Sequence, residues 1–280
     1  MSILEVKNLK YQYNNYEKTS KYVLDDVSFS IDEKDFVAII GKSGSGKSTL
    51  ISHLNGLYKA TSGDILYNGS SIYRKDYNLT GLRFKIGVVF QYPEYQLFSE
   101  TVIDDVAFGA IKKGLSKDEA YKKSEEILKL FEIEQLKNES PFNLSGGEKR
   151  KVAFAGIFVM EPEILIFDEP DAGLDATSKT NFYNLIKKLN EEKDTTIIFI
   201  THNLDDVMEY ANKVIVLNEG KLLKIGKPYE VLSDEEIMKN ADLDMPYAIQ
   251  IFNDLKIKGY NLDTNKLKFN ELYNQMLDIN

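Results

Sequence analysis

The segment Gly41-Lys42-Ser43-Gly44-Ser45-Gly46-Lys47-Ser48-Thr49 has the spacing G-x-x-x-x-G-K-S/T. It follows an apolar run at residues 36–40 and precedes a helix-like stretch at residues 50–57. Glycines let a backbone bend until several N–H groups and a helix N-terminus point at one phosphate. In this pattern the lysine reaches the β- and γ-phosphates, and the serine hydroxyl binds Mg²⁺. The segment therefore predicts a nucleotide phosphate site. The flanking strand and helix argue against the alternative, a Gly/Ser-rich linker.

Two carboxylates follow another buried run. Residues 164–167 are Ile-Leu-Ile-Phe, and Asp168 and Glu169 come directly after them. The carboxyl ends of parallel strands share one sheet edge, so we expect Asp168 near Lys47, where it can hold the same Mg²⁺ directly or through water. Glu169 can orient or deprotonate an attacking water. The alternative is a solvated cap after the strand.

A second glycine-led helix start lies between these two motifs. Leu144-Ser145-Gly146-Gly147-Glu148 precedes a helical run at residues 149–160. A helix N-terminus supplies backbone donors and the positive end of a dipole. Ser145, Gly146 and Gly147 therefore predict a second anion-binding terminus, although the segment alone would be an ordinary N-cap.

Apolar runs recur along the chain, and most of them do not alternate. Those at residues 36–40, 86–90, 164–167 and 196–200 are nearly continuous, which is typical of strands buried on both faces of a parallel sheet. Residues 24–31 alternate apolar and polar, as a half-solvated antiparallel strand does. The patterns predict an α/β fold: a mostly parallel sheet with an N-terminal antiparallel β-layer.

Helical signals fill two further regions. Strand signals disappear between about residues 101 and 160, and Ser116 and Glu119 form a capping box, which predicts an inserted helical subdomain at about 95–162. Another capping box, Ser233 to Glu236, and an apolar stripe that follows it predict helices near the C-terminus. We therefore expect a nucleotide-binding domain at 1–227 and a C-terminal helical extension at 228–280.

The composition limits the possible partners. The 280 residues are 43% hydrophobic, have a net charge of −9 and include no Cys. The acidic balance argues against electrostatic capture of nucleic acid or anionic lipid, so a membrane role needs a protein partner. No apolar run approaches the roughly 18 residues of a membrane span, and the first ten residues lack a signal-peptide core. The lack of Cys excludes disulfides and agrees with a reducing cytosol.

The order and spacing of the three motifs resemble an ABC-transporter ATPase, over residues 3 to about 227. In that family the stretch 144–148 is the signature. The resemblance implies a P-loop NTPase-type fold that binds ATP and Mg²⁺ and hydrolyses ATP to drive transport across a membrane.

The resemblance places further residues by their position. Gln91 matches the Q-loop glutamine, which touches Mg²⁺ or the water and faces the membrane subunit. Asp175 belongs to the D-loop, and His202 matches the switch histidine that reaches the γ-phosphate. Tyr13 matches the aromatic residue that stacks on adenine, with Tyr11 as the other candidate.

Other residues in this region have less specific interpretations. We interpret His53 as structural and the run Lys149-Arg150-Lys151 as a solvated helix face. Glu148, Lys151 and Asp171 depart from the residues common in the family, which are Gln, Arg and Thr. These departures concern the geometry of the shared interface rather than the hydrolytic residues.

Within the family, residues 90–98 (Phe-Gln-Tyr-Pro-Glu-Tyr-Gln-Leu-Phe) are similar to the second, A-prime, ATPase of energy-coupling factor importers of vitamins and metal ions. The resemblance implies that a transmembrane T component docks on this segment and that a membrane S component chooses the cargo. The chain would then lie peripherally on the cytoplasmic face of the cell membrane. The alternative for Tyr92, Tyr95 and Phe98 is packing between the sheet and the helical insertion.

The resemblance also implies that ATP lies between the phosphate loop of one subunit and the signature of another. We therefore expect a head-to-tail dimer with a paralogue or a second copy. The C-terminal helices are expected to stabilise it, the alternative being that they fold onto their own domain. The residues predicted for this contact are Ile249, Phe252, Leu255, Leu272 and Met276.

Four other classes of ATPase are weighed against this one. A substrate-binding-protein-dependent importer also uses a free-standing ATPase and is the second candidate. A ribosome-associated, nucleotide-switched binding module would normally carry two cassettes in tandem. A chromosome-maintenance ATPase would need a long heptad insertion between Lys47 and Asp168, and a drug exporter is disfavoured because no membrane segment is fused to the chain.

Overall fold

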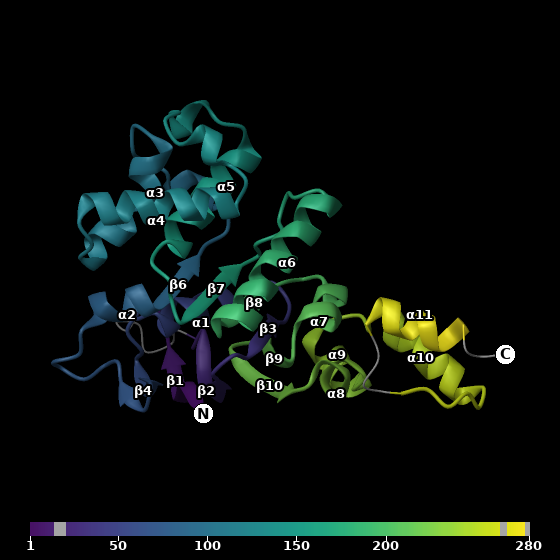
Figure 1. The fold of residues 1–280 in the computed structure, drawn as a ribbon. Helices are drawn as coiled ribbons and strands as arrows, with labels where there is room; N and C mark the ends of the chain where they lie inside the picture. Colours follow the sequence, from purple (N-terminus) through teal and green to yellow (C-terminus); the bar gives the residue numbers. More distant parts are fainter. Residues whose placement is uncertain (14–20, 264–267, 278–280) are drawn as a thin grey trace.

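The computed structural model describes residues 1–13, 21–263 and 268–277 (Figure 1). Its larger sheet has the strand order β10-β9-β3-β8-β7-β6, and every neighbouring pair is parallel except β9 with β10. The strands are β3 (Phe36–Ile40), β6 (Ile86–Val89), β7 (Ile164–Asp168), β8 (Thr196–Ile200), β9 (Lys213–Asn218) and β10 (Lys221–Gly226). Every residue of β3, β7 and β8 is buried, as their continuous apolar runs predict.

The smaller sheet is antiparallel and has the order β2-β1-β4-β5. Its strands are β1 (Ser2–Tyr11), β2 (Leu24–Asp32), β4 (Ser62–Tyr67) and β5 (Ser70–Ser71). In β2 the apolar residues are buried and alternate with polar ones. The predicted N-terminal antiparallel layer is therefore confirmed.

Two hydrophobic cores lie on opposite faces of the central sheet. Val37 and Ile39 of β3 pack in one core with residues of β1, β2 and β4. Ala38 and Ile40 pack in the other with residues of the helices that follow in the chain. The alternation of side chains along β3 thus joins the two layers through one strand.

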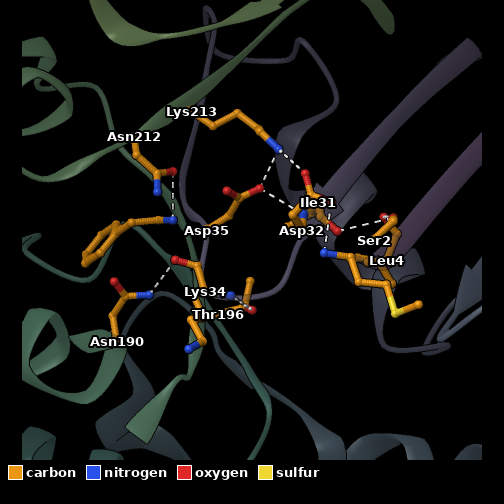
Figure 2. A network of polar contacts seen from close by, with 12 residues as sticks. Ser2, Leu4, Ile31, Asp32, Lys34, Asp35, Asn190, Thr196, Asn212 and Lys213 are labelled. Atoms are coloured by element: carbon orange, nitrogen blue, oxygen red, sulfur yellow. Dashed lines mark hydrogen bonds and ion pairs between the residues drawn. The ribbon is translucent and has the colours of Figure 1, made fainter. Parts of the chain in front are cut away.

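Polar contacts tie the sheets together at the amino ends of β3, β8 and β9 (Figure 2). Lys213 pairs with Asp35 and, at 3.4 Å, with Asp32 at the end of β2. The backbone N–H of Lys34 donates to the hydroxyl of Thr196 at 3.0 Å, and the side chain of Asn190 donates to the carbonyl of Lys34 at 2.9 Å. This edge is fixed by these contacts, and the loops at the opposite, carboxyl edge carry the predicted site.

Helices α3, α4 and α5 pack on one another and form a lobe beyond the strands β6 and β7 (Figure 1). The predicted capping box of Ser116 and Glu119 is present at the start of α4. The helices in this half of the chain are α1 (Lys47–Leu54), α2 (Leu79–Lys85), η1 (Pro93–Gln96), α3 (Val102–Lys113), α4 (Lys117–Leu130), η2 (Glu134–Leu136), η3 (Pro141–Asn143) and α5 (Gly146–Phe158).

The remaining helices are α6 (Ala176–Lys193), α7 (Leu204–Tyr210), α8 (Pro228–Leu232), α9 (Glu235–Ala241), α10 (Tyr247–Ile257) and α11 (Phe269–Leu277). The predicted capping box from Ser233 to Glu236 is wrong. Asp234 caps α9 instead, because its carboxylate accepts from the N–H of Ile237 at 3.1 Å. The hydroxyl of Ser233 is already bonded to the carbonyl of Tyr229 at the end of α8.

Helix α10 packs against the chain's own core. Ile249 and Phe252 are fully buried, so their predicted contact with a second subunit is wrong. Leu255 is half-buried and Met276 is exposed, while the side chain of Leu272 lies outside the described residues. No helix in the described ranges is long and apolar enough to cross a membrane.

Candidate active site

The phosphate loop connects the carboxyl end of β3 to α1. Gly41 and Gly46 have φ angles of 145° and 102°, which favour glycine. A Cβ on Gly41 would lie 2.1 Å from the carbonyl oxygen of Leu217, and one on Gly46 would lie 2.9 Å from that of Val23. Glycine at both positions therefore lets the loop run close to β9 and to the N-terminal layer, with Gly46 capping α1.

Lys47 lies inside this loop and is 6% exposed. Its Nζ donates to the carbonyl oxygens of Gly41 at 2.7 Å and Lys42 at 3.0 Å. An ammonium has three N–H donors, so one remains for a phosphate oxygen. Burial lowers the pKa of Lys47, while the charges of Glu169 and Asp168 oppose that shift.

Asp168 ends β7 beside this lysine and is 8% exposed. Burial raises the pKa of its carboxyl, and a hydrogen bond with Ser48 acts in the opposite direction. The structure therefore brings together the hydroxyl and the carboxylate that were predicted to bind Mg²⁺. No group of three or more His, Asp or Glu that could hold a metal occurs in the described ranges. One hydroxyl and one carboxylate suit Mg²⁺, which keeps waters and takes further oxygens from phosphates.

Glu169 is held from both sides by residues of neighbouring strand ends. The amide of Gln91, after β6, donates to its Oε2 at 3.0 Å, and Nε2 of His202, after β8, lies 3.0 Å from its Oε1. Because β6, β7 and β8 are adjacent, the three side chains meet at one edge. Glu169 also has a φ of 49°, a left-handed conformation that costs about 1–3 kcal/mol for a residue other than glycine.

Tyr13 lies at the side of the phosphate loop. Its hydroxyl is 2.9 Å from the hydroxyl of Thr49, the residue after Ser48, and its side chain is 59% exposed. An exposed ring that is fixed to the phosphate-loop helix can offer a face to a nucleotide base.

The signature segment opens α5 at the surface. Ser145 caps the helix in a capping box with Glu148, whose carboxylate accepts from the hydroxyl of Ser145 at 2.7 Å and from its N–H at 2.9 Å. These two hydrogen bonds lower the pKa of Glu148. A Cβ on Gly146 or Gly147 would meet no described atom within 4 Å. The described packing of the chain therefore does not itself require glycine at these two positions.

Asp175 caps α6, and its carboxylate accepts from the N–H of Ser178 at 2.9 Å. Asp171, directly before the D-loop (residues 172–175), belongs to an ion-pair network. Lys179 lies 3.1 Å from Asp171 and 2.5 Å from Asp206. The ion pair with Lys179 accounts for an Asp at position 171, where the family commonly has Thr. Sequence reasoning did not identify Lys179 or Asp206 as members of this network.

Asp206 gives a prediction on pH and stability. Burial raises the pKa of its carboxyl to about 6, although Lys179 acts in the opposite direction. Its pKa in the unfolded chain is about 4, so between pH 4 and 6 the folded state keeps a proton that the unfolded state releases, and this group costs stability as the pH rises. We expect Asp206→Asn to gain roughly 1–2 kcal/mol over the wild type between pH 4.5 and 7. Urea unfolding at micromolar concentration measures the difference, and a pH-independent difference would contradict the assignment.

Arg150 does not lie on a solvated helix face, as the sequence suggested. It is 6% exposed, and its Nη1 donates to the carbonyl of Ala172 in the D-loop at 2.5 Å. Phe154 and Phe158 follow it at intervals of four residues and are both buried. This spacing places Arg150 on the buried face of α5 and was visible in the sequence.

Comparison with known proteins identifies the family of the chain. Residues 24–172 match the ABC transporter family. The chain is 46% identical over 282 residues to the energy-coupling factor transporter ATP-binding protein EcfA2 of Clostridioides difficile strain 630, covering 100% of this chain and 98% of the relative. It is 43% identical over 283 residues to the protein of the same name from Ligilactobacillus salivarius, with 99% and 97% covered.

Two solved structures resemble it as well. CbiO1 from Clostridium perfringens, described as part of the ABC transporter complex CbiONQ, has a TM-score of 0.75 and 38% identity, covering 90% of this chain and 99% of that chain. The ATP-binding cassette MJ0796, solved as a post-hydrolysis dimer bound to ADP and Pi, has a TM-score of 0.71 and 32% identity, covering 80% and 98%. The predicted family and α/β fold are confirmed. The chain is a member of the ABC transporter ATPase family, in the branch of energy-coupling factor transporter ATP-binding proteins.

Proposed function

We propose that the chain is the second, A-prime, ATPase of an energy-coupling factor importer, which hydrolyses ATP to drive uptake of a vitamin or metal ion. The observation that carries this proposal is the carboxylate of Glu169, which lies between Gln91 and His202 at the sheet edge that also holds Lys47 and Asp168. An oriented carboxylate can accept a proton from a water that attacks the γ-phosphate.

Each neighbouring residue has a distinct part in this reaction. The ammonium of Lys47 and the backbone of residues 41–49 bind the phosphates, and Tyr13 supports the adenine. Gln91 and His202 hold Glu169 in place, and His202 also reaches the γ-phosphate. Ser48 and Asp168, together with Gln91, would hold Mg²⁺, which would supply positive charge to the phosphate oxygens.

The signature and the D-loop act on the ATP of another subunit. Ser145, Gly146 and Gly147 are exposed, and a Cβ on either glycine would have no neighbouring atom within 4 Å. These features support a head-to-tail dimer in which one subunit's signature covers the ATP of the other, with Asp175 nearby. ATP closes this dimer only to the extent that it binds the closed form better.

The segment after Gln91 is the proposed docking site for a transmembrane T component. Tyr92, Tyr95 and Phe98 are 48%, 85% and 58% exposed, which supports docking over internal packing. The chain would thereby sit on the cytoplasmic face of the membrane, next to an S component that binds the cargo.

We also propose the division into a nucleotide-binding domain at 1–227, with its helical subdomain at about 95–162, and an extension at 228–280. Val231 and Leu232 of α8 are fully buried in the core that also holds β3. A dimer contact of the extension would therefore use its outer residues, such as Tyr273 and Met276, which are exposed.

Copurification tests the proposal. The tagged chain, expressed with its genomic neighbours and extracted in detergent, should bring down a second ATPase and hydrophobic membrane subunits. Tyr95→Asp should lose most of the membrane subunits, because it puts a charge at the centre of the exposed aromatic segment. Tyr247→Asp is the matched control, since it puts the same charge on a tyrosine that is 77% exposed on α10 and outside that segment.

Other outcomes would favour the other classes. Copurification with a permease that works with a periplasmic or lipid-anchored binding protein would indicate the substrate-binding-protein-dependent importer. Ribosomes in the eluate would indicate the nucleotide-switched module and contradict transport.

A further inference from the structure

Four aromatic rings gather beside the phosphate loop and come from three segments of the chain. Tyr11 and Tyr13 lie at the end of β1, His53 lies on α1, and Tyr58 follows α1. The rings of Tyr11 and Tyr58 are stacked, with centroids 5.7 Å apart and planes 9° apart. The ring of His53 meets both edge-on, at 4.5 Å and 5.7 Å. The N-terminal layer is thus joined to the phosphate-loop helix through aromatic contacts.

Tyr13 is held against this group by its ring and by its hydroxyl. Its ring packs edge-on against Tyr11 at 5.1 Å and against Tyr58 at 6.2 Å. Edge-to-face pairs at these distances are favourable because the positive ring edge meets the negative ring face. The hydroxyl of Tyr13 bonds to that of Thr49 at 2.9 Å. These contacts fix the direction in which the exposed ring of Tyr13 points.

Thr49 also bonds to His53, through its backbone carbonyl. Nδ1 of His53 lies 2.7 Å from the carbonyl oxygen of Thr49, and a carbonyl only accepts, so Nδ1 carries the proton. His53 is fully buried, and burial lowers the pKa of its ring, which keeps it neutral. Thr49 therefore bonds to both Tyr13 and His53, and so connects the ring of Tyr13 to helix α1.

Exposure differs across the group in a way that suggests separate roles. His53 is buried and Tyr11 and Tyr58 are half-buried, whereas Tyr13 is 59% exposed. The three inner rings are positioned to support Tyr13, which is the most exposed ring of the four.

We propose that Tyr58, together with Tyr11 and His53, is a positioning residue that sets the ring of Tyr13 for stacking on the base of the bound nucleotide. This inference rests on the proposed function, in which Tyr13 supports adenine. Tyr58 itself touches no part of the nucleotide. Its contribution therefore reaches the ligand only through Tyr13, and a ligand without a base should not sense it.

Calorimetric titration of the full chain with MgATP and with magnesium tripolyphosphate tests the proposal. Tyr58→Leu keeps apolar volume but removes the stack on Tyr11, so we expect ATP affinity to fall about 3- to 10-fold, in line with the loss of one aromatic pair. Tripolyphosphate affinity should stay within about twofold, because it reports only on the phosphate loop. Tyr58→Phe keeps the ring and should bind both ligands like the wild type. In Tyr13→Ala/Tyr58→Leu the two losses should not add, because both act through one ring.

Tyr13→Ala separates the possible failures. If it weakens ATP but Tyr58→Leu does not, the positioning role is overturned and the adenine contact of Tyr13 stands. If Tyr58→Leu weakens ATP and tripolyphosphate equally, Tyr58 only supports the loop, and the positioning role is again overturned. If Tyr13→Ala itself leaves ATP affinity unchanged, the adenine contact falls and the positioning role falls with it.

Discussion

Replacing Glu169 with glutamine is expected to lower the ATP turnover of the assembled complex by about 10²- to 10⁴-fold, the contribution typical of a general base. The amide cannot accept the proton of the attacking water, yet its oxygen can still accept a hydrogen bond from Gln91 or His202, which now bond to the carboxylate at 3.0 Å. Lys47 and the phosphate loop, which bind the phosphates, are unchanged in this variant, and the charge of Asp168 still favours the protonated ammonium of Lys47. The variant should therefore bind ATP and remain as a closed dimer, seen as a nucleotide-dependent shift in size-exclusion chromatography.

Glu163→Gln provides the matched control for this experiment. Glu163 precedes β7 at the opposite end from Glu169, where it bonds to Tyr67 and Lys85. The substitution changes the charge by the same amount next to the same strand and should leave turnover within about twofold, since Glu163 lies at the opposite end of β7 from the site. Hydrolysis at the wild-type rate by Glu169→Gln in the purified complex would remove Glu169 from the mechanism.

The sequence was sufficient for the four apolar strands β3, β6, β7 and β8 of the central sheet and for placing Asp168 near Lys47. The buried strands β3, β7 and β8 are short, nearly continuous apolar runs, with polar residues only at the ends of β7 and β8 (Asp168 and Thr196). Such runs are typical of strands buried on both faces of a parallel sheet. Since the carboxyl ends of parallel strands lie at one edge of a sheet, the sequence alone predicted that Asp168 lies near Lys47. That Glu169 lies between Gln91 and His202 depends on the adjacency of β6, β7 and β8, which local patterns do not encode.

The errors arose where local signals compete or where burial depends on distant segments. At α9, Ser233 and Asp234 are both good caps, and the bond of Ser233 back to Tyr229 left Asp234 to cap the helix. On α10, Ile249 and Phe252 form an apolar stripe, and such a stripe does not tell whether it meets its own domain or a partner. The strand β10 was not predicted, because its residues are only partly buried and include lysines.

Replacing Lys47 with alanine is expected to weaken ATP binding by about 10- to 150-fold, the loss typical of a hydrogen bond to a charged group. Turnover should fall with it, because the same ammonium neutralises charge that develops on the phosphates. The side chain is buried and holds the loop through the carbonyls of Gly41 and Lys42, so the thermal unfolding midpoint must be measured alongside.

Lys34→Ala is the control, because Lys34 precedes the opposite end of β3, where its exposed ammonium pairs with Asp194 at 2.8 Å. It removes the same charge and should leave ATP affinity unchanged within about twofold. Calorimetry with MgATP decides: undiminished affinity in folded Lys47→Ala would place the phosphates elsewhere on the chain.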